Sequence, residues 1–152
     1  MCLLCSSAQA LFEDAVTKAA VTKWVGFYKA HRALLSSDIV HVRRPDNVGL
    51  DAIMHVNAGL QDAQGLAVVF NPTGSPANAT LPVNVYLAGI EGATVSVSRE
   101  GGPATSLAVS RDYTGGLPGV QLPARAVTGV TVSRYITSAA HPRGRRGRGE
   151  RG

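Results

Sequence analysis

The N-terminal part of the chain carries apolar residues at the spacing of an amphipathic helix. Between about Ser7 and Leu35 they recur every three or four positions, which predicts one long helix that Gly26 can bend or interrupt. Asp14 falls in an early turn, where a carboxylate suits the helix dipole. The periodic positions, with one histidine among them, are Phe12, Val16, Ala19, Trp24, Phe27, Tyr28, His31 and Leu35.

Aromatic residues are concentrated in the middle of this predicted helix. Trp24, Phe27 and Tyr28 fall within five consecutive positions. A helix with so much apolar surface needs a large partner surface. Two partners fit this pattern: the sheet of the same domain, or a neighbouring domain that this chain does not contain.

After Ser37 the pattern changes to a period of two, which is typical of β-strands. Short strands are predicted at residues 39–42, 51–57, 66–70, 77–81, 83–87, 94–98, 105–109 and 127–136. The unbroken apolar run at 66–70 indicates a central strand, and Pro82 indicates an edge position or a bulge. The glycine pairs at 101–102 and 115–116 are interpreted as turns.

These elements predict a mainly β fold, an antiparallel β-sandwich of about 7–8 strands preceded by a long N-terminal α-helix. No helical pattern separates the strands, which disfavours parallel βαβ units. The predicted organisation is an N-terminal helix at residues 1–36, a β-sandwich domain at 37–137 and a disordered Arg/Gly-rich tail at 138–152.

Composition changes this picture mainly through the distribution of charge. The 152 residues suit one domain, and the formal net charge is +5. Five arginines and Glu150 give residues 141–152 a net charge of +4, whereas residues 1–140 carry ten basic and nine acidic residues. The nearly neutral body excludes a broad basic face for nucleic acid but leaves a local patch open, and the tail offers a weak, salt-sensitive contact with RNA or DNA.

Residues with reactive or metal-binding side chains are few and scattered. Cys2 and Cys5 form one Cys-x-x-Cys pair without the further ligands that a zinc site requires. His31, His41 and His55 would bind a metal only if the fold gathered them, and His41 and His55 can face each other across a hairpin. The remaining candidates, Asp38, Asp46, Asp51 and Asp62, lie at predicted strand ends or turns, where aspartate hydrogen-bonds the backbone.

The sequence contains no motif of a known active site. It lacks a P-loop, a dinucleotide-binding Gly-x-Gly-x-x-Gly after a strand and a Gly-x-Ser-x-Gly elbow. We therefore assign no catalytic, cofactor-binding or metal-binding residue, and we expect no cofactor. Asn78-Ala-Thr80 matches a glycosylation sequon that matters only in a secreted chain. No signal peptide or membrane-spanning segment is recognisable, so the compartment stays open.

Three segments in a fixed order resemble a known arrangement. The first is the segment from Trp24 to Asp46, which begins Trp-Val-Gly-Phe-Tyr-Lys-Ala-His-Arg. The other two are the strand Asp51–Asn57 and the strand that ends in Phe70-Asn-Pro-Thr73. Together they resemble the junction between the last barrel helix and the C-terminal β-sandwich of glycoside hydrolases of the α-galactosidase and α-amylase type. The resemblance covers residues 12–136.

The resemblance implies a non-catalytic role for this chain. In such enzymes the catalytic carboxylates lie at the C-terminal ends of barrel strands, and no barrel strand is present here. We expect the sandwich to pack on and support a catalytic barrel, with a contribution to carbohydrate binding. The alternatives are a stand-alone carbohydrate-binding or adhesion sandwich, for which Tyr86, Tyr113 and Tyr135 are the available aromatic residues, and a nucleic-acid-associated protein acting through its tail.

Overall fold

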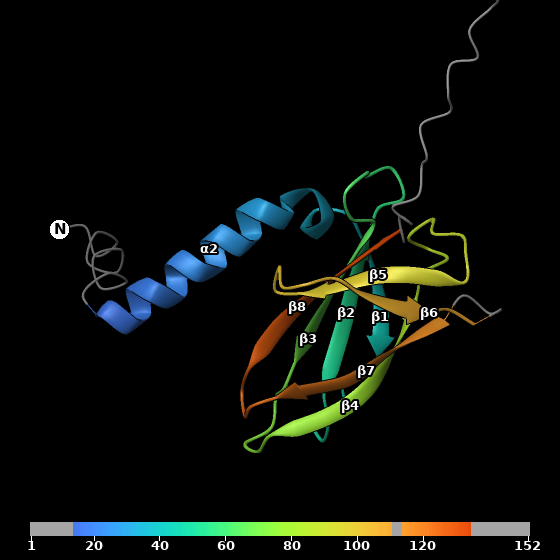
Figure 1. Ribbon diagram of the computed structural model, residues 1–152. Coiled ribbons are helices and arrows are strands. Elements are labelled where there is room, and N and C mark those ends of the chain that lie inside the picture. The colour runs from blue at the N-terminus through green and yellow to red at the C-terminus, as the bar shows by residue number, and fades with distance from the viewer. Residues whose placement is uncertain (1–13, 111–113, 135–152) are drawn as a thin grey trace, which may run out of the picture.

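The computed structural model describes residues 14–110 and 114–134, which form a helix followed by two antiparallel sheets (Figure 1). In chain order the elements are α2 (Ala15–Leu35), β1 (Asp38–Arg43), β2 (Asp51–Val56), β3 (Gly65–Phe70), β4 (Ala77–Asn84), β5 (Thr94–Arg99), β6 (Thr105–Ala108), β7 (Thr114–Leu122) and β8 (Val127–Arg134). The predicted mainly β fold with a leading helix is confirmed. The predicted Arg/Gly tail lies outside the described residues.

The strands form a six-stranded sheet in the order β1-β2-β3-β8-β5-β6 and a two-stranded sheet of β4 and β7. We call them the large sheet and the small sheet. They face each other as the two layers of a sandwich (Figure 1). The last strand, β8, lies in the middle of the large sheet, where it pairs with both β3 and β5.

The core lies between the two sheets. The large sheet supplies alternate residues such as Ala52, Met54, Val69 and Val132, and the small sheet supplies residues such as Leu81, all buried. Fully burying a side chain of this size contributes roughly 1.5–3 kcal/mol, so this layer stabilises most of the fold. The apolar run in β3 is buried on both faces, as predicted for a central strand, because helix α2 covers part of the outer face.

The chain around Pro82 forms one strand rather than two. β4 runs from Ala77 to Asn84 through an exposed Pro82, and its register shifts between Ala79 and Leu81. A two-stranded sheet consists of edges, so it tolerates the missing proline N–H, and the prediction of an edge or bulge is confirmed. The predicted strand at 83–87 is wrong beyond Asn84. Here a turn closed by Gly89 N donating to Tyr86 O at 2.9 Å replaces the ladder.

Strand β7 was not predicted from the sequence. Gly115 and Gly116, interpreted above as a turn, lie inside this strand. A Cβ on Gly115 would stand 3.0 Å from Leu107 Cδ2, and one on Gly116 would stand 3.1 Å from Thr80 Cγ2. The glycines therefore allow close approach of neighbouring strands, and for the same reason they remove the alternation of side chains by which a strand is recognised.

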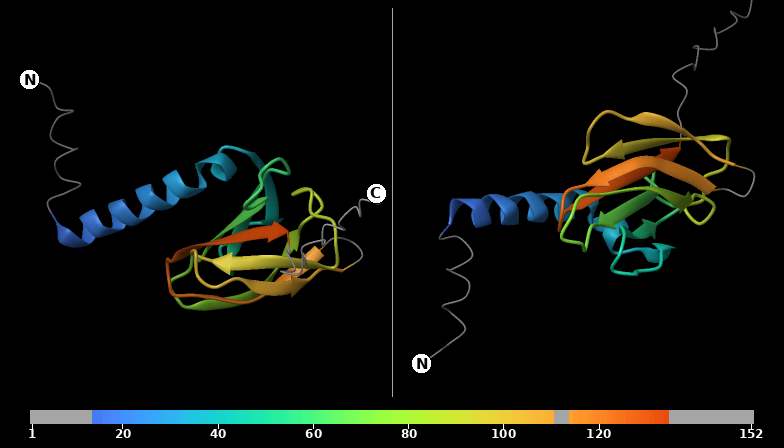
Figure 2. Two further views of the ribbon diagram at one scale, coloured as in Figure 1. Left: turned by 45° about the horizontal axis from the view of Figure 1, so that its top comes forward. Right: turned by 90° about the horizontal axis from the view of Figure 1, so that it is seen from below.

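Helix α2 is a continuous helix of 21 residues that begins after Asp14 and runs through Gly26 without a break. The prediction of one helix from near Ser7 is wrong at Asp14, whose extended backbone ends the helix on its N-terminal side, and residues 7–13 lie outside the described residues. Asp14 caps the helix, since its carboxylate accepts hydrogen bonds from Val16 N and Thr17 N, both at 3.0 Å. The C-terminal half packs on the outer face of the large sheet, whereas the N-terminal half extends past the sandwich into solvent (Figures 1 and 2).

Candidate functional site

The three candidate histidines do not form a metal site. Across the β1–β2 hairpin Ile39 pairs with His55 and His41 pairs with Ile53, so the two histidines share a face but are not opposite each other. The predicted facing arrangement is therefore wrong by two positions of register. His31 lies on helix α2 next to Phe27, with ring centroids 4.7 Å apart. Within residues 14–110 and 114–134 no cluster of three metal-binding side chains is found.

The candidate aspartates are separated, and the best defined one serves the backbone. Asp46 Oδ1 accepts hydrogen bonds from Val48 N at 2.9 Å and Gly49 N at 3.0 Å, and Oδ2 accepts one from Arg43 Nη2 at 2.6 Å. The hydrogen bonds from Gly49 N and then Val48 N lower the pKa of Asp46. The interpretation of Asp46 as a turn residue is thus confirmed. One oxygen of Asp51, at the start of β2, is buried without a hydrogen bond.

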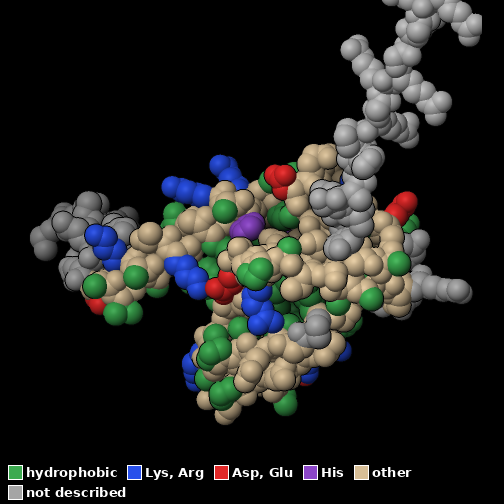
Figure 3. Space-filling view, in the orientation of Figure 1, with side chains coloured by type: hydrophobic (Ala, Val, Ile, Leu, Met, Phe, Trp, Pro, Cys, Tyr) green, Lys and Arg blue, Asp and Glu red, His purple; other side chains and the backbone are tan. Residues whose placement is uncertain are grey.

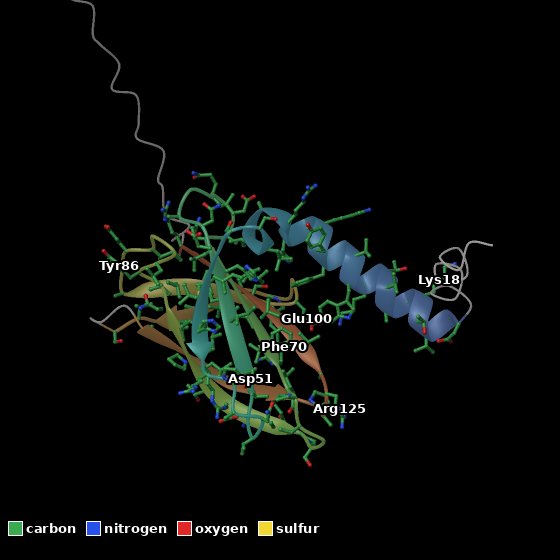
Figure 4. All side chains as sticks on the ribbon, turned by 180° about the vertical axis from the view of Figure 1, so that it is seen from behind. Lys18, Asp51, Phe70, Tyr86, Glu100 and Arg125 are labelled. Carbon is green, nitrogen blue, oxygen red and sulfur yellow. The ribbon has the colours of Figure 1, made fainter. Side chains whose placement is uncertain are left out.

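The remaining candidates lie at the surface or outside the described residues. Asn78 is exposed on β4, as a glycan acceptor would have to be. Tyr86 is 64% exposed, but it lies in a turn at the end of the sandwich and not on a sheet (Figure 4). Cys2, Cys5, Tyr113 and Tyr135 fall outside the described residues.

The most unusual feature of the described structure is how little of helix α2 is buried. Leu34 is the buried residue among its 21. Leu34, with the half-buried Phe27, packs against Leu66 and Val68 on the outer face of β3. Large apolar side chains elsewhere on the helix stay in solvent, with exposed fractions of 77% for Val16, 45% for Val25 and 48% for Tyr28.

A close approach of backbone and ring seats the helix on the sheet. A Cβ built on Gly129 of β8 would stand 2.5 Å from Phe27 Cζ. Carbon atoms in contact normally lie about 3.5–4.0 Å apart, so a glycine is required here for the ring to reach the sheet. Gly129 was not identified from the sequence, because a glycine has no side chain and this one lies in a strand, outside the apolar pattern of the helix.

A groove runs between the middle of helix α2 and the turn that joins β5 to β6. Its volume is about 340 Å³, and Lys23, Trp24, Phe27, His31 and Glu100 contribute to its walls. The Trp24 ring meets the Phe27 ring edge to face at 5.6 Å, and Lys23 Nζ lies 5.2 Å from the Trp24 ring centroid. The groove is open, mostly apolar and bordered by charged groups.

Glu100 holds the turn against the helix. Its Oε1 accepts a hydrogen bond from Thr128 Oγ1 at 3.0 Å, and its Oε2 accepts one from Lys23 Nζ at 3.4 Å. Glu100 has a φ of 49° and Gly101 one of 73°, the left-handed conformation of a tight turn. In Figure 4 Glu100 lies beside the helix, far from Lys18 at the helix tip. The contact joins residues 77 positions apart, a link that the sequence pattern does not signal.

Neither the groove nor the rest of the described surface contains a recognisable catalytic arrangement. The helix is the feature that distinguishes this structure from a plain sandwich. Among the described residues, no helix has both the length and the apolar character of a membrane-spanning segment. Searches of protein-family models, curated proteins and solved structures find no match to this chain.

Proposed function

We propose that this chain is a non-catalytic accessory β-sandwich that packs, through helix α2, on a neighbouring catalytic domain. The observation that carries the proposal is the exposure of Val16, Val25 and Tyr28 on a helix of which only Leu34 is buried. In proteins, most of the stability of a helix comes from tertiary packing of its apolar face. The half of α2 that extends past the sandwich receives no such packing from the described residues.

The proposed neighbour is the catalytic barrel of a glycoside hydrolase. This part of the proposal rests on the resemblance of the Trp24-to-Asp46 and Phe70-to-Thr73 segments to the junction between barrel and sandwich in such enzymes. A last barrel helix has one side on the barrel and continues directly into the next domain. Helix α2, which joins β1 after two residues, suits that position. In this arrangement the barrel supplies the catalytic carboxylates and the sandwich supplies support.

The Asn71 cluster gives one of the resembling segments a structural role. Asn71 is 2% exposed and its Nδ2 donates to Ser75 O, Leu122 O and Pro123 O at 2.9, 3.2 and 2.7 Å. Its Oδ1 accepts from Thr73 N at 3.1 Å and from Thr73 Oγ1 at 2.8 Å. The Asn-Pro-Thr sequence thereby fastens the end of β3 to the end of β7. Such a structural motif favours a supporting domain over a binding loop.

The experiment is to co-express the chain with the polypeptide encoded directly upstream of it and to measure co-elution by size-exclusion chromatography. We expect a hydrolase barrel that co-elutes with the chain, and we expect Val25→Glu with Tyr28→Glu to separate the two. Val48→Glu is the matched control, because Val48 is 80% exposed on the β1–β2 loop, away from the helix. An upstream frame without a barrel, or separate elution of the wild-type pair, would refute the proposal.

A second candidate function is carbohydrate binding in the groove beside Trp24. An indole next to Glu100 and Lys23 offers a face for a sugar ring and charged groups for its hydroxyls. The test is glycan-array binding of the wild-type chain and of Trp24→Ala. Binding that is lost in the variant would favour this function, whereas no binding by the wild type, or equal binding by both, would count against it.

A further inference from the structure

The face of helix α2 that points away from the sandwich is basic around an apolar centre. Helical spacing places Lys18, Val25, Lys29 and Arg32 on the side opposite Phe27 and Leu34, and it places Tyr28 on the adjoining flank, about 100° from Phe27. All five residues are exposed. We call these five residues the outward face. From Lys18 to Arg32 it is about 21 Å long at 1.5 Å per residue. Figure 3 shows Lys and Arg side chains standing on this outer side of the helix.

The cations of the outward face have no acidic partner in the described structure. Helix Ala15–Leu35 contains four basic residues and neither Asp nor Glu. Lys23, which lies on the other side, pairs with Glu100 at 3.4 Å. No such ion pair forms at Lys18, Lys29 or Arg32 within the described ranges.

This charge pattern does not suit a helix that faces only water. Solvated helices commonly pair Glu with Lys four positions apart, and like charges at these spacings destabilise a helix. Arg32 lies in the last turn, where the helix dipole favours a cation. Lys18 lies near the N-terminus, where the dipole disfavours a cation, and among the described residues only the N-cap Asp14, four residues before it, offsets that cost. Lys29 lies three residues from Arg32, a spacing at which like charges repel. A partner that brings negative charge would offset these costs.

The chemistry of the outward face selects among the partners that a basic helix can have. A second copy of the chain would bring like charges together. A membrane surface is bound through Trp, Phe or Leu, whereas the apolar centre here consists of Val25 and Tyr28. Nucleic acid would contact the cations, and a base would stack on Tyr28, but Val25 would stay unused. A protein surface with an apolar centre and a carboxylate rim matches both parts, as is usual for protein interfaces.

We infer that the outward face of helix α2 binds a protein surface whose apolar centre is rimmed by aspartate and glutamate. The inference rests on the proposed docking function and adds the chemistry of the partner. The exposed side chains of Val25 and Tyr28 contact the apolar centre, and Lys18, Lys29 and Arg32 pair with the surrounding carboxylates.

The experiment places a photo-cross-linking amino acid at position 28 of the full chain in the cells that produce it. Cross-linked peptides are sequenced by mass spectrometry, and the same amino acid at position 48 is the control. We expect an adduct from position 28 to a protein segment containing several Asp or Glu residues. We expect Lys18→Glu with Lys29→Glu to reduce its yield at least tenfold, and Lys18→Arg with Lys29→Arg to preserve it. Far-UV circular dichroism confirms that each variant keeps its helix.

The inference is overturned by an adduct to a second copy of the chain, to lipid, to nucleic acid or to a protein segment without acidic residues. It is also overturned if no adduct forms, if position 48 gives the same adduct, or if charge reversal leaves the yield unchanged. The result is distinguishable from a failure of the proposed function. An acidic partner other than a hydrolase barrel sustains the inference and refutes the barrel. A co-eluting barrel whose cross-linking yield is unchanged by charge reversal supports the proposed function and refutes the inference.

Discussion

Replacing Gly129 by alanine should loosen helix α2 without disturbing the core between the sheets. Gly129 lies on the outer face of β8, and a Cβ there would stand 2.5 Å from Phe27 Cζ, 2.7 Å from Phe27 Cε2 and 3.6 Å from Leu66 Cδ1. The Phe27 ring must therefore retreat by about 1 Å to reach an ordinary contact distance. Its neighbours resist this shift, since Trp24 and His31 lie with their ring centroids 5.6 and 4.7 Å away.

The free energy of this change has two opposing parts. Overpacking of this kind costs about 1–3 kcal/mol. Alanine in place of glycine within a strand returns about 0.5–1 kcal/mol. When Phe27 is first replaced by alanine, the clash disappears and only the favourable part is left. The effect of Gly129→Ala should therefore change sign between the two backgrounds, with a coupling of about 1–3 kcal/mol.

The assay is a double-mutant cycle by urea unfolding. Trp24 is the only tryptophan of the chain and contacts Phe27, so its fluorescence follows helix docking, while far-UV circular dichroism follows the helix and the sheets together. Additivity within about 0.5 kcal/mol would refute the reasoning, because independent sites add to that accuracy. Val68→Ala, on the same face of the sheet, serves as a control for simple loss of packing.

The remaining predictions concern groups with defined hydrogen bonds. Asn71→Ala should lower the free energy of unfolding in urea by about 1–3 kcal/mol, because the carbonyl groups of Leu122 and Pro123 lose their hydrogen-bond donor. Gln64 is fully buried and links Leu60 O to Arg134 N, so Gln64→Leu should cost a similar amount and expose the end of β8 to hydrogen exchange. The hydrogen bond from Thr17 Oγ1, and then those from Val16 N and Thr17 N, lower the pKa of Asp14. The Asp14 cap stabilises the helix fully above the pKa that aspartate has in the unfolded chain, about 3.9. This stabilisation is lost as the pH falls through the lower pKa of Asp14 in the folded protein. Helicity measured by circular dichroism should fall in that window in the wild type, and Asp14→Ala should show the reduced value at every pH.

The sequence predicted those elements whose side chains carry a periodic signal. The run 66–70 was recognised as a central strand because all its side chains are apolar, and the aromatic residues of the helix signalled a need for a partner. Strand β7 was missed because Gly115 and Gly116 offer no alternation. The register of the β1–β2 hairpin, which separates His41 from His55, depends on loop geometry and a bulge that residue types do not encode.

The candidate site was only partly accessible to sequence reasoning. The aromatic residues of the helix were visible in the sequence, but which of them faces the sheet was not: Phe27 packs on it, whereas Tyr28 is exposed. The Lys23–Glu100 contact and the seat of Phe27 on Gly129 join the helix to strands distant in the chain. Such long-range contacts follow from tertiary packing, which no local pattern records.

The central position of β8 has a consequence for how this protein folds during synthesis. The middle of the large sheet is complete only after residues 127–132 have been synthesised and have paired with residues 65–70. Until then β3 presents an unpaired apolar edge, which is prone to pair with other chains. Pairing across such a sequence separation is also slow, because a long loop must close first. Yield in cells should therefore depend on the speed with which the ribosome delivers the final strand, and on chaperones that shield β3 meanwhile.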